Sequence, residues 1–534
     1  MSNFGLGVMI DCSRGAVMNV PSLKRFIDLL SKMGYKALQL YTEDTYEIPE
    51  EPYFGYLRGK YTQKELREVD AYAAARGVEL IPCIQTLAHL DAIVRWDRFR
   101  PIVDINNILL AEDEGTYQLI EEMFSSIEAT FSSRRIHIGM DEAHMVGLGK
   151  YLDKHGYQNR AEILLRHLSR VTEIAARHGF RPIMWSDMFF ELATGGGYRP
   201  GATFSPEVLD KVPENLDLVY WDYYRLDPAF YEGVLRVHQN FHNPIIFAGG
   251  LWTWRGFAPM TRSSLRTTDA ALEACRKTGV RDIFFTLWGD DGGECSYFSA
   301  LPMLFYASRA LDGAPDPEKL REEFREITGE DYDRMTEMSD VNLPSDTAPF
   351  SNSSKVWLYQ DPFLGLFDRT VPPDAPARLE AVADRLEASA AESPTCGDLY
   401  RLEAAFARAA ARKCDIGVRT RAAYRAGDRA ALLSLAEVDY PRAREAVDAL
   451  HRAFEMVWFS DNKPNGYELH DTRLGGLSSR ISTCAARLAA YASGALDSLP
   501  ELEEDILPAQ GGKDNLPDLQ EWARIAFPYG RAGH

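Results

Sequence analysis

The chain has 534 residues, 46% of them hydrophobic and 26% charged, which is the composition of an ordinary globular protein rather than a disordered or fibrous one. Its 79 acidic residues outnumber its 59 basic residues and give a formal net charge of −20. This excess of negative charge argues against nucleic acid or an anionic membrane surface as a partner, and it favours an enzyme with a neutral or cationic ligand.

The N-terminal residues have no basic region, and their apolar run ends at Asp11, so we expect no signal peptide. No stretch approaches the ~18 uninterrupted apolar residues that a membrane span needs. The seven cysteines are scattered, odd in number and without paired C-x-x-C spacing. This pattern predicts reduced, mostly structural thiols and a cytoplasmic location.

Short apolar runs alternate with longer amphipathic ones over the first ~310 residues, which indicates parallel strands joined by crossover helices. Residues 160–178 show the helical pattern most clearly, with Leu164, Leu168, Val171 and Ala175 on one stripe. About eight apolar runs are present, which is the number that closes a (β/α)8 TIM barrel. The expected strands are residues 5–10, 37–41, 79–85, 135–140, 181–186, 217–223, 244–249 and 282–288.

The residues that directly follow each predicted strand are the candidates for a functional site, because TIM barrels carry their active sites at the C-terminal ends of the strands. A single tryptophan there is often a packing residue, but tryptophans recur after successive strands. Aromatic walls beside carboxylates and one arginine suit the apolar faces and hydroxyls of a sugar. In chain order the candidates are Asp11, Arg14, Glu43, Asp44, His89, Asp141, Glu142, Trp185, Asp187, Trp221, Asp222, Tyr224, Trp252, Trp254, Trp288, Asp290 and Asp291.

Two adjacent carboxylates, Asp141 and Glu142, end the fourth predicted strand. Such a pair has to be solvated, hydrogen-bonded or shifted in pKa, which is typical of general acid/base chemistry. The dipeptide alone does not decide the matter, because Asp113-Glu114 is a second one in a polar run without a preceding strand. The position at a strand end favours the functional interpretation.

Six segments resemble the motifs of glycoside hydrolase family 20, the exo-acting β-N-acetylhexosaminidases, and occur in that family's order. Residues 137–142 are similar to its His-x-Gly-Gly-Asp-Glu motif, with Met140 in place of the second glycine. Two departures are a start at the barrel, without the small N-terminal domain common in the family, and no Tyr-x-Asp segment after the seventh strand. The other five segments are residues 11–14, 41–44, 82–89, 184–187 and 287–290.

The resemblance implies a retaining mechanism in which the 2-acetamido group of a terminal N-acetylhexosamine attacks its own anomeric carbon. Glu142 is then the general acid, and Asp141 binds the acetamido N–H and the developing oxazolinium charge. Neither a metal nor a cofactor is implied. Arg14 would bind two ring hydroxyls, and His89 with Glu43 or Asp44 would orient Glu142.

Matching positions also predict the residues that surround the sugar. Trp185, Trp221 and Trp288 would enclose the acetamido methyl and the sugar face, and Asp290 would bind a distal hydroxyl. We expect Tyr224, with Asp222 on the same face, to polarise the acetamido carbonyl, and Tyr223 is its rival. His137, Trp252 and Trp254 complete the predicted set of substrate-binding residues.

Two other function classes are left open by the residues. A retaining glycosidase with its own nucleophile needs a second carboxylate about 5 Å from Glu142, and Asp290 or Asp222 would supply it. A non-catalytic sugar-binding protein would use the same aromatic residues without the acid. A metal-dependent hydrolase is disfavoured, because His89, His137 and His144 show no H-x-H or H-E-x-x-H spacing.

Beyond residue ~340 the amino-acid composition changes to sequence rich in Ala, Arg and Glu, which predicts an all-helical C-terminal domain. We divide the chain into a catalytic barrel at residues 1–338 and a helical domain at 339–534, with linker-like sequence at 339–354. Residues 458–476 are polar, aromatic and glycine-rich, and are expected to form a loop between helices. Such a loop would cover the barrel mouth, form a contact in a homodimer or merely join two helices.

Overall fold

A computed structural model describes residues 5–343, 349–509 and 519–528. The chain forms two compact units, each built from several segments. The first comprises Met1–Leu251, Ser264–Trp288 and Met303–Leu320, and the second comprises Trp252–Ser263, Gly289–Pro302 and Arg321–His534. A domain boundary between residues 338 and 339 stays a prediction.

The first unit contains a closed barrel of eight parallel strands, so the predicted TIM barrel is confirmed. Around the barrel the order is β1-β10-β9-β8-β7-β6-β3-β2, and β1 closes the sheet against β10 with Leu6 opposite Ile283. The strands are β1 Leu6–Asp11, β2 Ala37–Tyr41, β3 Glu79–Cys83, β6 Arg135–His137, β7 Arg181–Trp185, β8 Asp217–Trp221, β9 Ile245–Gly250 and β10 Ile283–Leu287.

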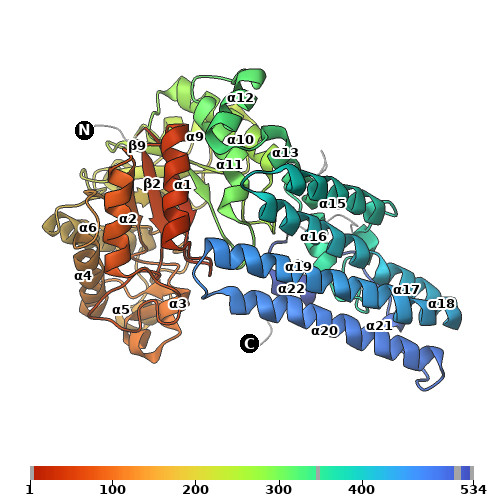
Figure 1. Ribbon diagram of the computed structural model, residues 1–534. Coiled ribbons are helices and arrows are strands. Elements are labelled where there is room, and N and C mark those ends of the chain that lie inside the picture. The colour runs from red at the N-terminus through yellow and green to blue at the C-terminus, as the bar shows by residue number, and fades with distance from the viewer. Residues whose placement is uncertain (1–4, 344–348, 510–518, 529–534) are drawn as a thin grey trace. The chain divides into compact units, whose positions relative to one another are not determined.

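Helices connect the strands and, like α1 and α2, lie along the outside of the sheet (Figure 1). Their ends follow the sequence: α2 begins with a capping box between Thr62 and Glu65, and α1 ends at the left-handed Gly34. The main helices are α1 Val20–Met33, α2 Gln63–Ala74, α4 Glu114–Glu128, α6 Arg160–Arg177, α7 Asp187–Thr194, α9 Pro228–His238, α10 Thr261–Thr278 and α11 Leu301–Arg309. Shorter insertions are α3 Asp91–Val94, the antiparallel pair β4 Val103–Ile105 and β5 Ile108–Leu109, α5 Lys150–His155 and α8 Pro206–Leu209.

The barrel interior is a packed core of buried side chains, among them Met9, Ile81, Ile183 and Phe284. Trp185 is fully buried in this core, and Trp221 and Trp288 pack against it while staying partly exposed. The core therefore ends in aromatic residues where the strands end, which is where the functional residues were expected.

The second unit is helical, as predicted for the C-terminal region. Helices α15, α16, α19 and α20 pack in succession (Figure 1). The helices of this unit are separated by short breaks; for example, α16 ends at Lys413 and α17 begins at Ile416. The helices are α12 Pro317–Thr328, α13 Tyr332–Glu337, α14 Ser353–Tyr359, α15 Ala375–Glu392, α16 Gly397–Lys413, α17 Ile416–Arg425, α18 Arg429–Ser434, α19 Tyr440–Asp461, α20 Tyr467–Ala492, α21 Pro500–Glu503 and α22 Trp522–Ala526.

The prediction that residues 458–476 form a loop is wrong, because α19 extends to Asp461 and α20 begins at Tyr467. The rings of Trp458, Tyr467 and His470 pack against one another, with centroids 5.1–6.0 Å apart. Burial of these rings outweighs the roughly 1 kcal/mol that each glycine costs inside a helix. Part of the predicted linker at 339–354, residues 344–348, lies outside the described residues.

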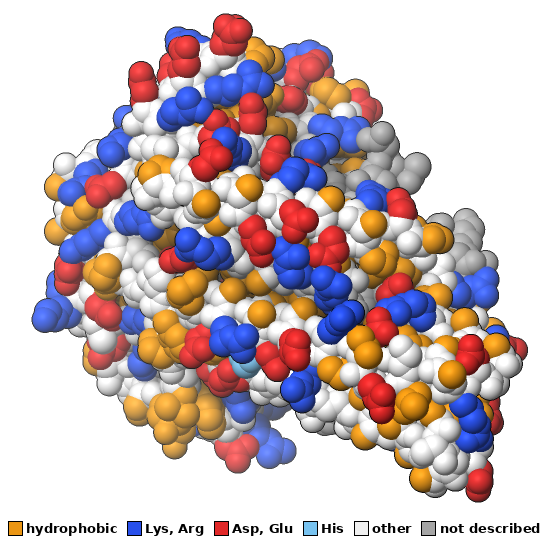
Figure 2. Space-filling view, turned by 45° about the vertical axis from the view of Figure 1, so that its right-hand side comes forward, with side chains coloured by type: hydrophobic (Ala, Val, Ile, Leu, Met, Phe, Trp, Pro, Cys, Tyr) orange, Lys and Arg blue, Asp and Glu red, His pale blue; other side chains and the backbone are white. Residues whose placement is uncertain are grey.

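Acidic and basic side chains are interspersed on the face of the molecule that Figure 2 shows. The acidic excess of the sequence is therefore not gathered there into one patch. Among the described residues, none of the helices has the length and apolar character required to cross a membrane.

Candidate active site

The turn that follows β6 carries the two predicted catalytic carboxylates in a strained backbone. Gly139, Met140 and Glu142 all have positive φ angles, of 71°, 70° and 50°. Positive φ is uncommon for residues other than glycine and gathers at functional sites. Glu43 and His89, which follow β2 and β3, share this feature with φ angles of 47° and 58°.

Hydrogen bonds from three directions hold this turn in place. The N–H of Gly139 donates to Nδ1 of His137 at 3.1 Å, and the N–H of Met140 donates to Oε1 of Gln85 at 3.1 Å. The N–H of Glu142 donates to Oδ2 of Asp187 at 3.0 Å. Side chains just after β3, at the end of β6 and at the start of α7 therefore position the two carboxylates.

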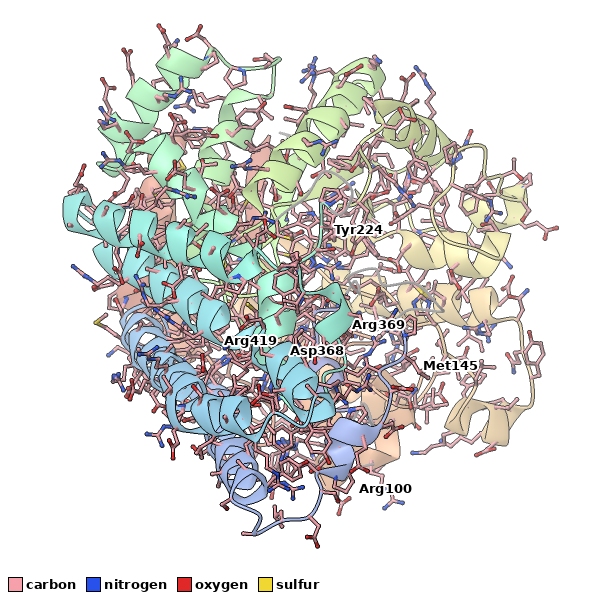
Figure 3. All side chains as sticks on the ribbon, turned by 90° about the vertical axis from the view of Figure 1, so that its right-hand side faces the viewer. Arg100, Met145, Tyr224, Asp368, Arg369 and Arg419 are labelled. Atoms are coloured by element: carbon pink, nitrogen blue, oxygen red, sulfur yellow. The ribbon has the colours of Figure 1, made fainter. Side chains whose placement is uncertain are left out.

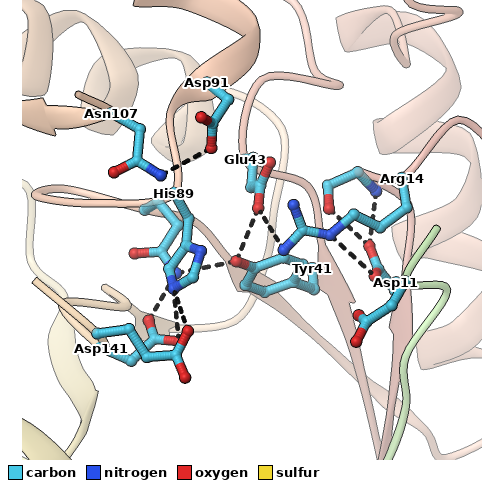
Figure 4. A network of polar contacts seen from close by, with 12 residues as sticks. Asp11, Arg14, Tyr41, Glu43, His89, Asp91, Asn107 and Asp141 are labelled. Carbon is cyan, nitrogen blue, oxygen red and sulfur yellow. Dashed lines mark hydrogen bonds and ion pairs between the residues drawn. The ribbon is translucent and has the colours of Figure 1, made fainter. Parts of the chain in front are cut away.

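Asp141 is buried and held in its ionised form. Nε2 of Gln85 donates to Oδ1 of Asp141 at 2.7 Å, and Nε2 of His89 lies 3.2 Å from Oδ2 (Figure 4). Burial by itself would raise the pKa of Asp141, but the charge of His89 and these hydrogen bonds lower it below the usual range. Asp141 can thus accept an N–H or face a developing positive charge.

His89 lies between the two carboxylates, because its Nε2 is also 3.5 Å from Oε2 of Glu142. Burial alone would lower the pKa of His89, but the attraction of Asp141 outweighs it and raises the pKa to about 9. His89 is therefore cationic at neutral pH.

A chain of polar contacts links Asp141 to Arg14 across the rim (Figure 4). Nε2 of Gln85 also donates to the hydroxyl of Tyr41 at 3.0 Å, and that hydroxyl donates to Oε1 of Glu43 at 3.0 Å. Nη2 of Arg14 lies 3.2 Å from the same oxygen of Glu43. Burial raises the pKa of Glu43 to about 7, against the lowering effect of Arg14 and His89.

The second acid of the β2 rim, Asp44, is held apart from this chain. Its Oδ1 lies 3.4 Å from Nε of Arg58. Of the two acids that the sequence offered as partners of His89, Glu43 is therefore the one connected to Asp141.

Glu142 differs from Asp141 in being open to solvent, with 47% of its side chain exposed. It lines a cavity of about 280 Å³ together with Asp187, Trp221, Asp222 and Tyr224. Asp187 links Glu142 to Trp221. Its Oδ2 accepts from the backbone N–H of Glu142, and its Oδ1 accepts from the indole N–H of Trp221 at 3.3 Å. Burial and the charge of Asp141 raise the pKa of Asp187 to about 7.

The aromatic residues expected around the sugar lie at different depths of the rim. Trp185 is fully buried, with its ring 4.4 Å from His137 and 6.2 Å from Trp288. Trp288 lies edge-on to Tyr41 at 4.8 Å, and Trp221 lines the cavity beside Glu142. Trp221 and Trp288 are the two that keep exposed surface.

The two rival tyrosines occupy different surroundings. Tyr223 is buried and hydrogen-bonds to the side chains of Thr286 and Trp288. It is also close enough to Asp141 to be affected by the negative charge of that carboxylate. Tyr224, labelled in Figure 3, is 46% exposed and lines the cavity beside Glu142. Asp222 lines the same cavity and accepts a hydrogen bond from the N–H of Tyr224 at 3.0 Å.

Four further predicted site residues have other surroundings. His137 is fully buried, where its ring supports the turn from inside the barrel, and burial lowers its pKa to about 3. Trp252, Trp254 and Asp290 belong to the second unit. There the rings of Trp252 and Trp254 stack at 4.6 Å, and Oδ2 of Asp290 accepts from Nε2 of Gln520 at 3.0 Å.

Three residues without a role assigned from the sequence are central to the geometry of the site: Tyr41 and Gln85, which were not among the candidates, and Asp187, which was a candidate only by its position. Tyr41 and Gln85 end predicted strands and Asp187 follows one, so their positions were visible in the sequence. Their partners were not visible, because Gln85 and Asp141 are 56 residues apart. Within the described part of the chain, no three or more His, Cys, Asp or Glu residues are grouped so as to hold a metal ion.

Several known proteins and protein families resemble this chain in sequence. Residues 6–223 match the description "Glycosyl hydrolase family 20, catalytic domain", and residues 330–519 match "Glycoside Hydrolase 20C C-terminal domain". The chain is 26% identical over 221 residues to Hexosaminidase D of Bos taurus, a match that covers 39% of this chain and 60% of the bovine protein. It is 32% identical over 137 residues to Beta-hexosaminidase of Vibrio furnissii, covering 23% and 21% of the two chains.

Among solved structures, the β-N-acetylhexosaminidase from Bacteroides fragilis has a TM-score of 0.47 and 20% identity, covering 61% of this chain and 69% of that one. The matched stretches span less than two thirds of the bovine and Vibrio relatives. The matches to the catalytic domain and to the C-terminal domain of one family cover the barrel and the helical region in turn. The chain belongs to glycoside hydrolase family 20.

Proposed function

We propose that this protein is an exo-acting β-N-acetylhexosaminidase that removes terminal β-linked N-acetylglucosamine, N-acetylgalactosamine or both. The observation that carries the proposal is the contrast between the adjacent carboxylates: Asp141 is buried and ionised, and Glu142 is open to a cavity. Family membership and the names of the hexosaminidase relatives support the same activity.

In the proposed reaction the substrate supplies its own nucleophile, the 2-acetamido oxygen, and retains its anomeric configuration. Glu142 donates a proton to the glycosidic oxygen, and Asp141 accepts the acetamido N–H and stabilises the oxazolinium charge. Cationic His89 keeps Asp141 ionised and lies within 3.5 Å of Glu142. Water then opens the oxazolinium ring with Glu142 acting as base.

Tyr223 is better placed than Tyr224 to polarise the acetamido carbonyl. Its phenol is buried beside Trp288 and within the field of Asp141, whereas Tyr224 lies on the open side of Glu142. Trp288, which keeps exposed surface, would form the wall against the acetamido methyl, and buried Trp185 would support it from inside the barrel. Arg14, fixed by Glu43, would present its guanidinium to ring hydroxyls.

Hydrolysis of aryl β-N-acetylglucosaminide and aryl β-N-acetylgalactosaminide, measured side by side, tests the activity. Glu142→Gln should lower kcat by ~10²-fold or more. Strong inhibition by an oxazoline-mimicking thiazoline supports substrate assistance. Equal hydrolysis of a 2-hydroxy glycoside would contradict it, and a trapped covalent glycosyl-enzyme would favour a carboxylate nucleophile such as Asp222.

A sugar-binding protein without catalysis is the remaining alternative. Such a protein would bind an N-acetylhexosaminide without releasing sugar, and Glu142→Gln would leave its behaviour unchanged.

We also propose that the protein works in a reducing compartment, which fits the cytoplasm. None of the seven cysteines, all of them among the described residues, is in a disulfide, and all are buried. Buried thiols are usual where disulfides do not form. Cell fractionation tests the location, and analytical ultracentrifugation tests whether the chain forms the homodimer that the sequence left open.

A further inference from the structure

The proposed hydrolysis of an N-acetylhexosaminide does not say which part of a substrate the cavity beside Glu142 would bind. Its walls come from two rim segments besides the β6 turn. Glu191 and Tyr198 belong to α7 and the loop after it, and Tyr224 and Arg225 follow β8. The cavity lies wholly within the first unit.

The cavity lies on the leaving-group side of the catalytic pair. Asp141, which addresses the acetamido group, is buried against Gln85 and His89 and does not line the cavity. Glu142 does line it. Because a general acid has to reach the glycosidic oxygen, the group beyond that oxygen must extend to the open side of Glu142.

The size of the cavity, about 280 Å³, is near the lower end for small-molecule sites, so it suits one sugar ring rather than an extended chain. The ring of Tyr224 is 46% exposed and offers an apolar face for stacking. Glu191 and Arg225, both partly exposed, can bind hydroxyl groups.

Carboxylates outnumber cations around the cavity. The acids are Glu142, Asp187, Glu191 and Asp222, and the basic residues are His144 and Arg225. Arg225 is already paired with Asp222, since its Nε lies 3.6 Å from Oδ2. His144 lies 4.0 Å from Glu191, and both are exposed. Glu142 is protonated when it acts as general acid, and the charge of Arg225 is offset by Asp222. Glu191 therefore leaves the cavity with an excess of negative charge, which would repel a negatively charged ligand.

We infer that this cavity binds the single sugar residue next to the scissile bond, that it selects a neutral ring over a uronate, and that Tyr224 and Glu191 determine this preference. The inference rests on the proposed hydrolysis, and it specifies the leaving group as a neutral sugar residue. Tyr224 then contributes to binding the leaving group and not to activating the acetamido carbonyl.

The stacking role is tested with two substrates that share the N-acetylglucosamine ring. One is N-acetylglucosamine β-linked to glucose, and the other is the oxazoline of N-acetylglucosamine, which has no leaving group. Tyr224→Ala should lower the ratio of kcat/KM for the disaccharide to that for the oxazoline about tenfold. Tyr157→Ala, which removes a tyrosine that is 76% exposed and outside the cavity, should leave the ratio at the wild-type value. An unchanged ratio in Tyr224→Ala would overturn the inference.

The charge preference is tested by replacing glucose with glucuronate in the disaccharide. The wild-type protein should cleave the neutral disaccharide at least tenfold faster, and Glu191→Gln should narrow the difference severalfold. Glu173→Gln, on an exposed site of α6 outside the cavity, is the matched control. Equal cleavage of the two disaccharides by the wild-type protein would contradict the inference. Failure to cleave the oxazoline and both disaccharides would instead count against the proposed hydrolysis, and with it against the inference.

Discussion

At the residue scale, the site depends on the different burial and charge environments of two neighbouring acids. Asp141 is surrounded by Gln85 and His89 and stays ionised although it is buried. Glu142, one residue later, points to the cavity. Side chains of adjacent residues diverge. The positive φ angles of Met140 and Glu142 set the backbone of the turn and thereby the directions of the Asp141 and Glu142 side chains.

The ion pair between His89 and Asp141 should give the fold a stability that depends on pH. The pKa of His89 rises from 6.5 to about 9 on folding, which corresponds to roughly 3 kcal/mol. Because the folded pKa is the higher one, this contribution is fully present below pH ~6.5 and is lost as pH rises through ~9. Urea unfolding from pH 6 to pH 10 measures it.

His89→Asn is the matched variant for this test, since asparagine tolerates the left-handed backbone of His89. The difference in unfolding free energy between the wild-type protein and His89→Asn should shrink across pH 9. A difference that stays constant over this range would show that His89 is not charged in the folded protein.

The two tyrosines after β8 should respond differently to loss of the hydroxyl. Tyr223→Phe removes the phenol that lies beside Trp288, and we expect kcat to fall ~10²-fold because the acetamido carbonyl loses its donor. Tyr224→Phe keeps the ring that lines the cavity, so kcat should stay within about threefold of the wild-type value. The reverse result, with loss of turnover only in Tyr224→Phe, would restore Tyr224 as the polarising residue.

At the element scale, the turn after β6 lies so close to the residues that follow β3 that only glycine fits at residue 139. A Cβ there would lie 2.0 Å from Oε1 of Gln85 and 2.9 Å from the carbonyl oxygen of Ile84, and its φ is 71°. The strand end and its turn therefore act as one rigid support for Asp141.

Gly139→Ala should displace Gln85 and thereby the hydrogen bond to Asp141. We expect a loss of more than ~2 kcal/mol in unfolding free energy and at least about a tenfold loss in kcat. Gly77→Ala is the control, because Gly77 has a similar φ of 69° with no atom within 4 Å of the added Cβ. Its cost of about 1 kcal/mol should come without loss of kcat. Equal effects of the two variants in urea unfolding and turnover would mean that the contact with Gln85 is unimportant.

At the scale of the whole molecule, the second unit is organised around a buried group of charges. Nζ of Lys355 lies 2.6 Å from Glu294 and 3.0 Å from Asp291, and Arg473 pairs with the same two acids. Only 1% of the Lys355 side chain is exposed. This group joins segments that are far apart in the sequence into one core.

Lys355→Met should destabilise the protein by ~3–5 kcal/mol, because it leaves part of the negative charge of Asp291 and Glu294 buried without compensation. Thermal or urea unfolding measures this loss. Lys277→Met breaks an exposed pair with Glu273 in α10 and should cost no more than about 0.5 kcal/mol. Similar losses in the two variants would argue that the buried group contributes little.

Much of the barrel was predictable, because strands and helices leave local periodic patterns. The second strand was predicted at its observed bounds, and the others within a few residues. The failure at residues 458–476 has a physical cause: glycine and polar residues locally favour a loop, and only contacts between α19 and α20 make burial of Trp458 and Tyr467 favourable.

The sequence by itself determined the number and order of the strands and the residues that end at the rim, since both follow from spacing along the chain. Tertiary structure alone decided which of those residues meet. Gln85 hydrogen-bonds to Asp141, which is 56 residues away in the sequence, and Asp187 hydrogen-bonds to Glu142, which is 45 residues away. No local pattern encodes such pairs, because they depend on how β3, β6 and β7 close into one barrel.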